Sequence, residues 1–202
     1  MEIPVDIGIG PAAHFITGPI QDDQLIHTGL VISVQAIIDK AVIKKYKKRI
    51  PEKYRELALS MDEVRFSPSI FIPDTLIISP GYANTGIYGV SWRPISVGVP
   101  LVDSNHFKLD VNAGARLTYL YIHSSSLESP THFLRPGLDI KANCEIPFST
   151  NVLLSVGWSS QAYIPQAIGG SITSIGGLDE SIWHIGQAYL KLHYRFPYQV
   201  SF

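Results

Sequence analysis

Cysteine is almost absent from the sequence. The single cysteine, Cys144, excludes an internal disulfide. Its context, KANCEI, suggests neither a catalytic nucleophile nor a metal ligand. We interpret Cys144 as a small apolar side chain and expect no metal and no other cofactor.

Charge is also scarce. Charged residues make up 16% of the chain, whereas about a quarter is usual in soluble domains. The formal net charge of -1 gives no overall argument for nucleic-acid binding, so we expect no nucleic-acid partner. A hydrophobic content of 46% excludes a disordered chain. The length suits one domain that spans residues 1–202.

Long apolar runs are missing as well. No window holds about 18 consecutive apolar residues, so we expect no transmembrane helix. The first residues, MEIPVDIGIG, lack the basic and apolar regions of a signal peptide. The chain is therefore expected either to stay in the cytoplasm or to be a mature chain that carries an added Met.

Strict alternation of apolar and polar residues is what the sequence has instead. It is clearest in HFKLDVNAGARLTYLY (106–121) and recurs in 5–15, 26–35, 134–146 and 188–202. Strands of soluble proteins usually have about 5–6 residues. A strand tilted by about 45° needs roughly 9–11 residues to cross a bilayer core. The length of these runs therefore favours strands that span a membrane.

The two faces of these strands favour a polar interior and a lipid-facing exterior. A half-buried soluble sheet, with its apolar face inward, is the alternative. The polar face, however, mixes glycine, serine and asparagine with opposed charges, which suits a narrow, crowded lumen. The apolar face carries aromatic residues near strand ends, as in the girdles at bilayer interfaces. The expected interior polar network comprises Asp6, Lys108, Asp110, Arg116, Arg135, Asp139, Lys141, Glu145, Lys191, His193 and Arg195.

The end of the chain, YRFPYQVSF (194–202), alternates apolar residues and stops at Phe202. It resembles the C-terminal signal of bacterial outer-membrane β-barrel proteins. The resemblance implies a closed antiparallel transmembrane β-barrel in the outer membrane of a Gram-negative-type bacterium. It also implies contact with the lipid bilayer and lipopolysaccharide, and insertion by the barrel assembly machinery. Pro197, which removes one ladder donor, departs from the usual pattern.

We therefore expect an all-β fold with about eight strands. Two of the strands are irregular: FSPSIFIPDTLII (66–78) is interrupted by proline, and a bulge near Arg93–Pro94 would keep 85–101 on one face. An even number of strands puts both termini on one side, normally the periplasm. The outer loops would then be 17–24, 79–84, 123–131 and 164–183. The expected strands are 3–16, 25–36, 65–78, 85–101, 106–122, 132–146, 151–163 and 184–202.

The segment 37–63 has helical rather than alternating periodicity. Ile37, Ile38, Ala41 and Val42 recur at helical spacing, and Pro51 suits a first helical residue. A second apolar stripe comprises Tyr54, Leu57, Ala58 and Met61. We expect a short amphipathic helical insertion between the second and third strands, on the periplasmic side.

A basic run, KKYKKR (44–49), lies within this insertion. It predicts binding to anionic headgroups or to a periplasmic partner, and a solvated helix face is the alternative. The residues concerned are Lys44, Lys45, Lys47, Lys48 and Arg49.

The segment IHSSSLESPTH (122–132) raises the possibility of catalysis. His123 and Ser125 match the minimal H-x-S element of barrels that resemble this one in size and deacylate lipid A. Ser126–Leu127 follows where that family has Asn–Ala. A Ser, a His and the acid Glu128 could form a hydrolytic triad. His123 and His132 could instead form a metal pair, and a polar surface loop without chemistry is the alternative. We assign no catalytic residue and leave enzymatic activity open.

The function favoured by the sequence is binding, anchoring or scaffolding in the outer membrane, without a wide pore. An eight-stranded barrel leaves an interior only wide enough for side chains. The alternatives are an enzyme that modifies lipid A or lipopolysaccharide, and a narrow channel for ions or small solutes. A soluble lipocalin-like carrier is the rival fold. The apolar loop 164–183 is expected to meet a partner or lipid, or to fold over the barrel mouth.

Overall fold

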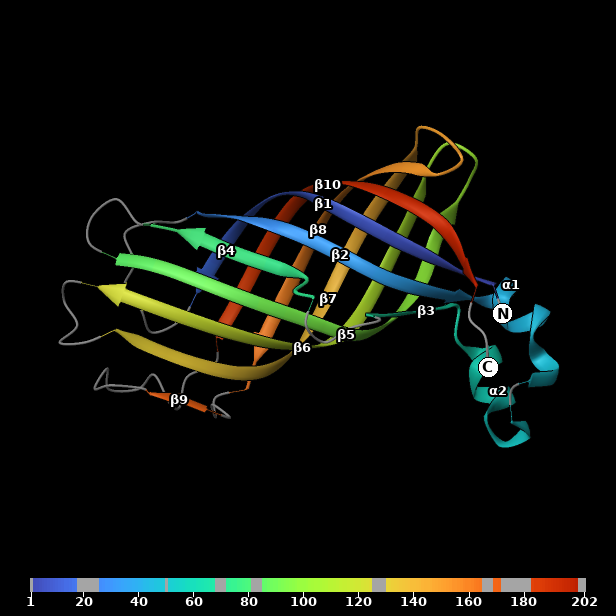
Figure 1. Ribbon diagram of the computed structural model, residues 1–202, viewed down its shortest axis with the longest axis horizontal. Coiled ribbons are helices and arrows are strands. Elements are labelled where there is room, and N and C mark those ends of the chain that lie inside the picture. Colours follow the sequence, from blue (N-terminus) through green and yellow to red (C-terminus); the bar gives the residue numbers. More distant parts are fainter. Residues whose placement is uncertain are drawn as a thin grey trace.

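The strands of the chain close into one elongated barrel (Figure 1). The computed structural model describes residues 2–17, 26–49, 51–67, 72–80, 85–124, 130–164, 169–171 and 183–199. No helix in this described part is long and apolar enough to cross a membrane.

The chain order is almost entirely β, with two helices after the second strand. The elements are β1 (Glu2–Thr17), β2 (His27–Asp39), α1 (Lys40–Lys45), a 3-10 turn (Lys47–Arg49), α2 (Glu52–Ser60), β3 (Glu63–Phe66), β4 (Thr75–Ser79), β5 (Thr85–Asp103), β6 (Lys108–Ser124), β7 (Thr131–Pro147), β8 (Val152–Tyr163), β9 (Gly169–Ser171) and β10 (Trp183–Gln199).

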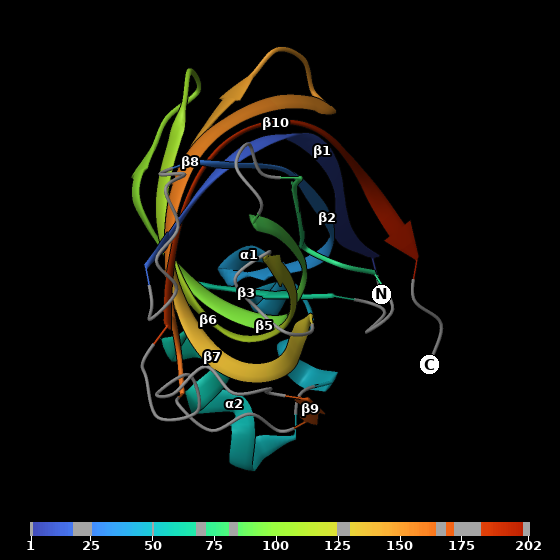
Figure 2. The ribbon, with the colours of Figure 1, turned by 90° about the vertical axis from the view of Figure 1, so that its left-hand side faces the viewer.

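The first and last strands close the ring. Ile7 of β1 pairs with Tyr194 of β10 on one side and with Val34 of β2 on the other, both antiparallel. The remaining neighbours follow the chain, and the strands form a ring when viewed from the end opposite the termini (Figure 2). The ring has eight antiparallel positions, so the expected all-β closed barrel is confirmed. Such closure leaves no unpaired edge.

The third position of the ring is divided between β3 and β4. Both strands lie between β2 and β5, with β3 nearer the termini and β4 nearer the opposite end. The alternation predicts one strand over 65–78, and the structure differs because the ladder is interrupted before Asp74. Pro73 has no amide hydrogen to donate to a ladder. A bulge in β5 lies opposite the interruption, between Trp92 and Ile95, and this confirms the expected bulge.

The apolar phase of the strands points outward. Leu138 is 70% exposed and Ile140 is 61% exposed, and the same face of β10 carries Leu192 and Tyr194. The opposite phase is buried in the lumen and is mostly polar. This arrangement excludes the lipocalin-like alternative, in which the apolar face would line the cavity. An apolar outer surface on a closed barrel is the surface of a transmembrane barrel.

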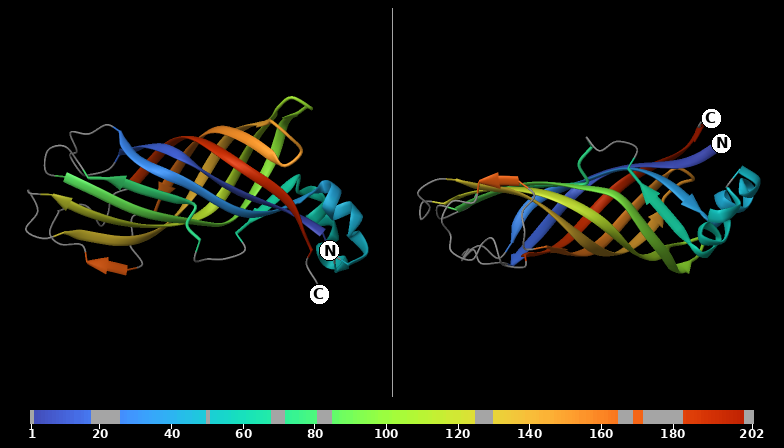
Figure 3. Two further views of the ribbon diagram at one scale, coloured as in Figure 1. Left: turned by 45° about the horizontal axis from the view of Figure 1, so that its top comes forward. Right: turned by 90° about the horizontal axis from the view of Figure 1, so that it is seen from below.

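The helical insertion lies at the same end of the barrel as both termini (Figure 3). The helical spacing predicts that it begins at Ile37, but β2 continues to Asp39 because Ile37 and Ile38 pair with Arg65 and Val64 of β3. The Asp39 side chain then caps α1 by accepting from the Val42 amide at 2.8 Å. Likewise, α2 begins at Glu52, directly after Pro51.

Candidate functional site

The lumen nearest the termini is filled by ion pairs. Arg195 donates to Asp6 at 2.9 Å and to Glu145 at 3.0 Å. Arg65 donates to Glu145 at 3.3 Å and also to Glu63. Arg195 keeps 26% of its side chain exposed, whereas the other four side chains are at most 5% exposed. Three carboxylates and two guanidinium groups from β1, β3, β7 and β10 therefore form a connected set of ion pairs in a confined space.

Two further side chains, His193 and Lys108, border this group. His193 Nδ1 lies 2.6 Å from Asp6 Oδ1, and the other ring nitrogen of His193 hydrogen-bonds the Ser155 hydroxyl. Lys108 donates to Glu63 at 2.5 Å. These contacts bind β1, β3, β6, β8 and β10 to one another across the lumen.

A second group of ion pairs lies deeper in the barrel. Arg93 donates to Asp139 at 2.9 Å and to Asn112 at 2.6 Å. Arg116 donates to Asp74 at 2.6 Å and lies 3.5 Å from Asp139. All these residues are buried. The β5 bulge turns Arg93 inward, and the break between β3 and β4 supplies Asp74.

Asp110 joins the two groups. Asn112 donates to it at 2.7 Å, Asn143 at 3.2 Å, and Arg65 lies 3.4 Å away. Buried charges are tolerated only where they are paired and hydrogen-bonded, and this arrangement meets that requirement. We call the whole set the ion network: Asp6, Glu63, Arg65, Asp74, Arg93, Lys108, Asp110, Arg116, Asp139, Glu145, His193 and Arg195.

Tyr189 lies between two buried lysines in the same part of the lumen. Lys141 Nζ is 4.6 Å and Lys191 Nζ is 5.6 Å from the centre of the Tyr189 ring. The Tyr189 hydroxyl donates to Asn143 at 3.0 Å. Only a glycine at position 157 allows this, because a Cβ there would overlap the Tyr189 hydroxyl. The aromatic face of Tyr189 favours the charged form of both lysines.

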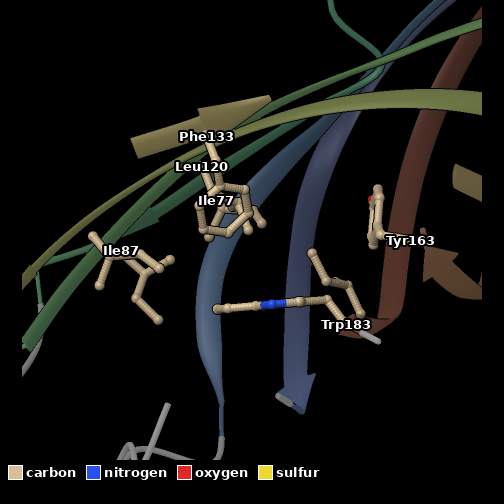
Figure 4. Close-up of a cluster of buried hydrophobic side chains, with 8 residues drawn as sticks. Ile77, Ile87, Leu120, Phe133, Tyr163 and Trp183 are labelled. Carbon is tan, nitrogen blue, oxygen red and sulfur yellow. The ribbon is translucent and has the colours of Figure 1, made fainter. Parts of the chain in front are cut away.

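The other end of the lumen holds a cluster of buried, mostly apolar side chains (Figure 4). Phe133 and Trp183 meet with ring centroids 5.1 Å apart, and the Arg135 guanidinium lies 4.9 Å and 5.9 Å from these two rings. We call the cluster the outer plug: Ile77, Ile87, Leu120, Ile122, Phe133, Tyr163, Trp183 and Ile185.

The residues expected in the interior separate into three settings. Arg135 lies in the outer plug, and Lys141 and Lys191 lie against Tyr189. The others lie in the ion network: Asp6, Lys108, Asp110, Arg116, Asp139, Glu145, His193 and Arg195.

Sequence reasoning missed part of the ion network and the whole outer plug. Glu63, Arg65 and Asp74 lie where prolines and the insertion break the alternation, so no period marks them. Arg93 lies at the bulge itself. The plug residues share the inward phase of the polar residues; Leu120, for example, continues the phase of Arg116 and Thr118. That continuity is the signal that could have found them.

The basic run is exposed at the end of the barrel that holds the termini. Lys44, Lys45, Lys47 and Lys48 all face outward into solvent, and the side chain of Arg49 lies outside the described residues. Lys45 Nζ is 3.6 Å from a Glu2 carboxylate oxygen. A hollow of about 420 Å³ lies beside this pair, between α1 and the end of β10. It is lined by Val42, Lys45, Asn151, Arg195 and Phe196, among others.

The remaining expected sites are only partly described. His123 is exposed near the end of β6, and His132 packs against Tyr119 with ring centroids 6.0 Å apart. Ser125 and Glu128 lie outside the described residues, as does most of 164–183. Within that loop, β9 pairs with His132–Leu134 of β7. Among the residues that the structure describes, no cluster of three or more His, Cys, Asp or Glu could hold a metal.

No family model and no curated protein matches the sequence. Solved structures do match in shape, and they include the following two. Neisserial surface protein A (NspA) has a TM-score of 0.51 at 12% identity, covering 95% of this chain and 97% of NspA. Ail, the attachment invasion locus protein of Yersinia pestis, has a TM-score of 0.52 at 11% identity, covering 97% of this chain and 100% of Ail.

The likeness is one of fold. The chain is a small eight-stranded barrel of the outer-membrane type. Together with the apolar outer surface, this architecture assigns the chain to the bacterial outer membrane, as the C-terminal resemblance implies. The bilayer is therefore the environment of the exposed apolar face.

Proposed function

We propose that the protein is a closed outer-membrane anchor that binds anionic groups through its basic run, rather than a pore. The observation that carries the proposal is the occupation of the lumen by side chains at two levels, the ion network and the outer plug. With the interior occupied by the protein's own side chains, the function is expected on its surfaces.

The ion network disfavours the entry of a charged solute into the lumen. Its carboxylates and cations already neutralise one another at hydrogen-bonding distance, so an incoming ion would have to displace a protein partner. The outer plug is mostly apolar: the Tyr163 hydroxyl already donates to Gln161 at 2.6 Å, and the neighbouring Arg135 guanidinium lies over the Phe133 and Trp183 rings. A narrow channel is the rival function, and it requires that both levels open together.

The basic run is the surface best suited to binding. Four lysines lie on or beside a short helix that the Asp39 cap and the Lys40–Asp62 ion pair fix to the barrel. Each lysine near an anionic surface contributes on the order of 1 kcal/mol. We assign this end to the periplasm, where the ligand would be inner-leaflet headgroups or an acidic partner. The name of Ail describes attachment, and a binding role for this barrel agrees with that precedent.

The test measures attachment of the basic run to an anionic surface. The chain is refolded into phosphatidylcholine nanodiscs and titrated with vesicles of phosphatidylcholine alone or with phosphatidylglycerol. We expect binding only to the anionic vesicles, weakening with salt as the Debye length falls. Replacing Lys44, Lys45, Lys47 and Lys48 by Gln should weaken it at least tenfold.

The control is Lys53→Gln in α2, which removes an exposed charge outside the run and should change binding less than twofold. Equal binding by the quadruple variant and the original chain would overturn the role of the basic run. Binding to neither vesicle, with retention of acidic periplasmic peptides, would assign the ligand to a protein partner.

A further inference from the structure

Three polar side chains meet on the lipid-facing side of the barrel, near the end opposite the termini. Ser160 of β8 and His184 of β10 are half-buried, and Thr17 of β1 is exposed. β10 lies between β1 and β8 in the ring (Figure 1), with Thr17 directly opposite His184. All three share the outward phase of exposed residues such as Trp158 and Leu190.

The contacts of His184 suit the tautomer in which Nδ1 carries the hydrogen. His184 Nε2 lies 2.7 Å from the Ser160 hydroxyl oxygen, and Nδ1 lies 3.5 Å from the Thr17 hydroxyl oxygen. The Thr17 hydroxyl donates to the backbone carbonyl of His184 at 3.4 Å, so its oxygen is left to accept from Nδ1–H. Nε2 is then the acceptor for the Ser160 O–H. With Nδ1 as donor and Nε2 as acceptor, both ring nitrogens have a partner.

This arrangement is that of an activated nucleophile. Hydrolytic sites pair a hydroxyl with a base at about 2.6–3.2 Å, and a third group orients the base. Such catalytic groups recur on unrelated folds in different sequence orders, so a site is recognised by its residue types and their geometry. Gly186, the residue paired with Ser160, has no side chain to separate it from His184.

The position of the cluster relative to the bilayer suggests its substrate. Phe15 and Trp158 pack together with ring centroids 5.4 Å apart, and each lies two residues before a member of the cluster. Aromatic residues of this kind lie at the interface between hydrocarbon and headgroups. The Ser160 hydroxyl, one step further out, is then level with the acyl esters of the outer leaflet.

We propose that Ser160, His184 and Thr17 form an esterase site that cleaves ester-linked acyl chains of outer-leaflet lipids. Ser160 is the nucleophile, His184 is the general base, and Thr17 is a positioning residue. The site is separate from the lumen and from the basic run, so it does not depend on the proposed binding function. It depends only on the assignment of this end to the cell exterior.

The reaction is a two-step acyl transfer to water. The Ser160 oxygen attacks the ester carbonyl as its proton passes to His184 Nε2. The bond from the carbonyl carbon to the alcohol oxygen breaks, and the alcohol leaves with that proton. Water, deprotonated by His184, then cleaves the Ser160 ester, which releases the fatty acid and restores both side chains.

The test uses the full chain refolded into proteoliposomes, with folding checked by heat-modifiability. A fluorophosphonate probe should label Ser160, located by mass spectrometry. Fatty-acid release is measured in two arms, phosphatidylethanolamine and lipopolysaccharide, and the arm that yields product identifies the lipid. Ser160→Ala and His184→Gln should each lower labelling and release at least tenfold.

The two control variants remove a hydroxyl or an imidazole elsewhere on the same lipid-facing surface. Thr28→Val removes an outward hydroxyl that donates to the Ile78 carbonyl, and His132→Gln removes an outward imidazole; neither should alter labelling. Thr17→Val should lower kcat for fatty-acid release at unchanged KM, because Nδ1–H loses its acceptor while the side chain keeps its shape, and Thr17→Ser should restore the rate. An unchanged kcat in a folded Thr17→Val variant would show that Thr17 does not position His184.

Two outcomes would overturn the proposal. One is a folded chain that takes up no probe and releases no fatty acid in either arm. The other is labelling that survives Ser160→Ala but disappears in Ser125→Ala, which would assign the activity to the outer loop instead.

Discussion

Phe133 and Trp183 meet edge to face across the outer end of the lumen, with centroids 5.1 Å apart and ring planes at 60°. They come from β7 and β10, which are not neighbours in the ring. Only β8 lies between them, so their contact bridges one strand inside the lumen and packs part of its outer end.

Removing either ring should destabilise the barrel. Phe133→Ala and Trp183→Ala each create a cavity among buried side chains, and we expect a loss of about 3–5 kcal/mol in the free energy of unfolding. The measurement is a urea titration of the refolded protein in lipid vesicles. Phe148→Ala, in an exposed turn with the ring 66% exposed, is the matched control and should cost under about 1 kcal/mol. Equal effects at the two sites would contradict the plug.

The ion network should be far more sensitive than the surface ion pairs. Asp139→Asn weakens the pairing of both Arg93 and Arg116 in a buried site, and we expect a loss of about 3–5 kcal/mol. Glu2→Gln breaks only its exposed pair with Lys45 and should cost about 1 kcal/mol or less. The same urea titration compares them. If the Asp139→Asn variant unfolds with the same free energy as the original chain, the network is not fully charged.

The orientation of the strands can be tested with spin labels. Labels at Leu138, Ile140 and Leu192 should be relaxed strongly by oxygen and weakly by water-soluble reagents, because these side chains face lipid. A label at Ser159, which is buried in the lumen, is the contrast. The background needs Cys144→Ser, since Cys144 is the sole native cysteine. Protection of the outward labels from oxygen would contradict the lipid-facing assignment.

The sidedness of the insertion is a separate prediction. A Lys47→Cys variant, also in the Cys144→Ser background, should resist a membrane-impermeant thiol reagent in intact cells and react after the outer membrane is permeabilised. Lys47 is exposed and closely follows α1, which lies at the same end of the barrel as both termini; we assign this end to the periplasm. Rapid labelling of intact cells would put the insertion on the cell surface and reverse the topology.

The alternation of the strands made much of the barrel predictable. A period of two residues assigns each side chain to the lumen or the lipid, as with Ile140 outside and Lys141 inside. The bulge could be located because the apolar phase changes around Pro94. The division of the third position into β3 and β4 could not, since it depends on pairings with both neighbours that no local pattern records.

The sites that depend on contacts across the ring were out of reach of the sequence. Asp74 meets Arg116 only after β4 and β6 take their places on the ring. Likewise, Thr17 and His184 are far apart in the chain and become neighbours through the register of β1 with β10. Alternation predicts whether a side chain faces the lumen or the lipid. Its partner on a neighbouring strand depends on the register between the two strands, which alternation does not predict.

Closure of the lumen is the central claim, and ion conductance in planar lipid bilayers tests it most directly. The refolded chain should show no steady conductance, because the ion network and the outer plug both close the path. Phe133→Ala combined with Trp183→Ala should still conduct little, since the network remains, and adding Asp139→Ala and Arg116→Ala should produce openings. Large, stable openings of the unmodified protein would contradict the account and identify it as a channel.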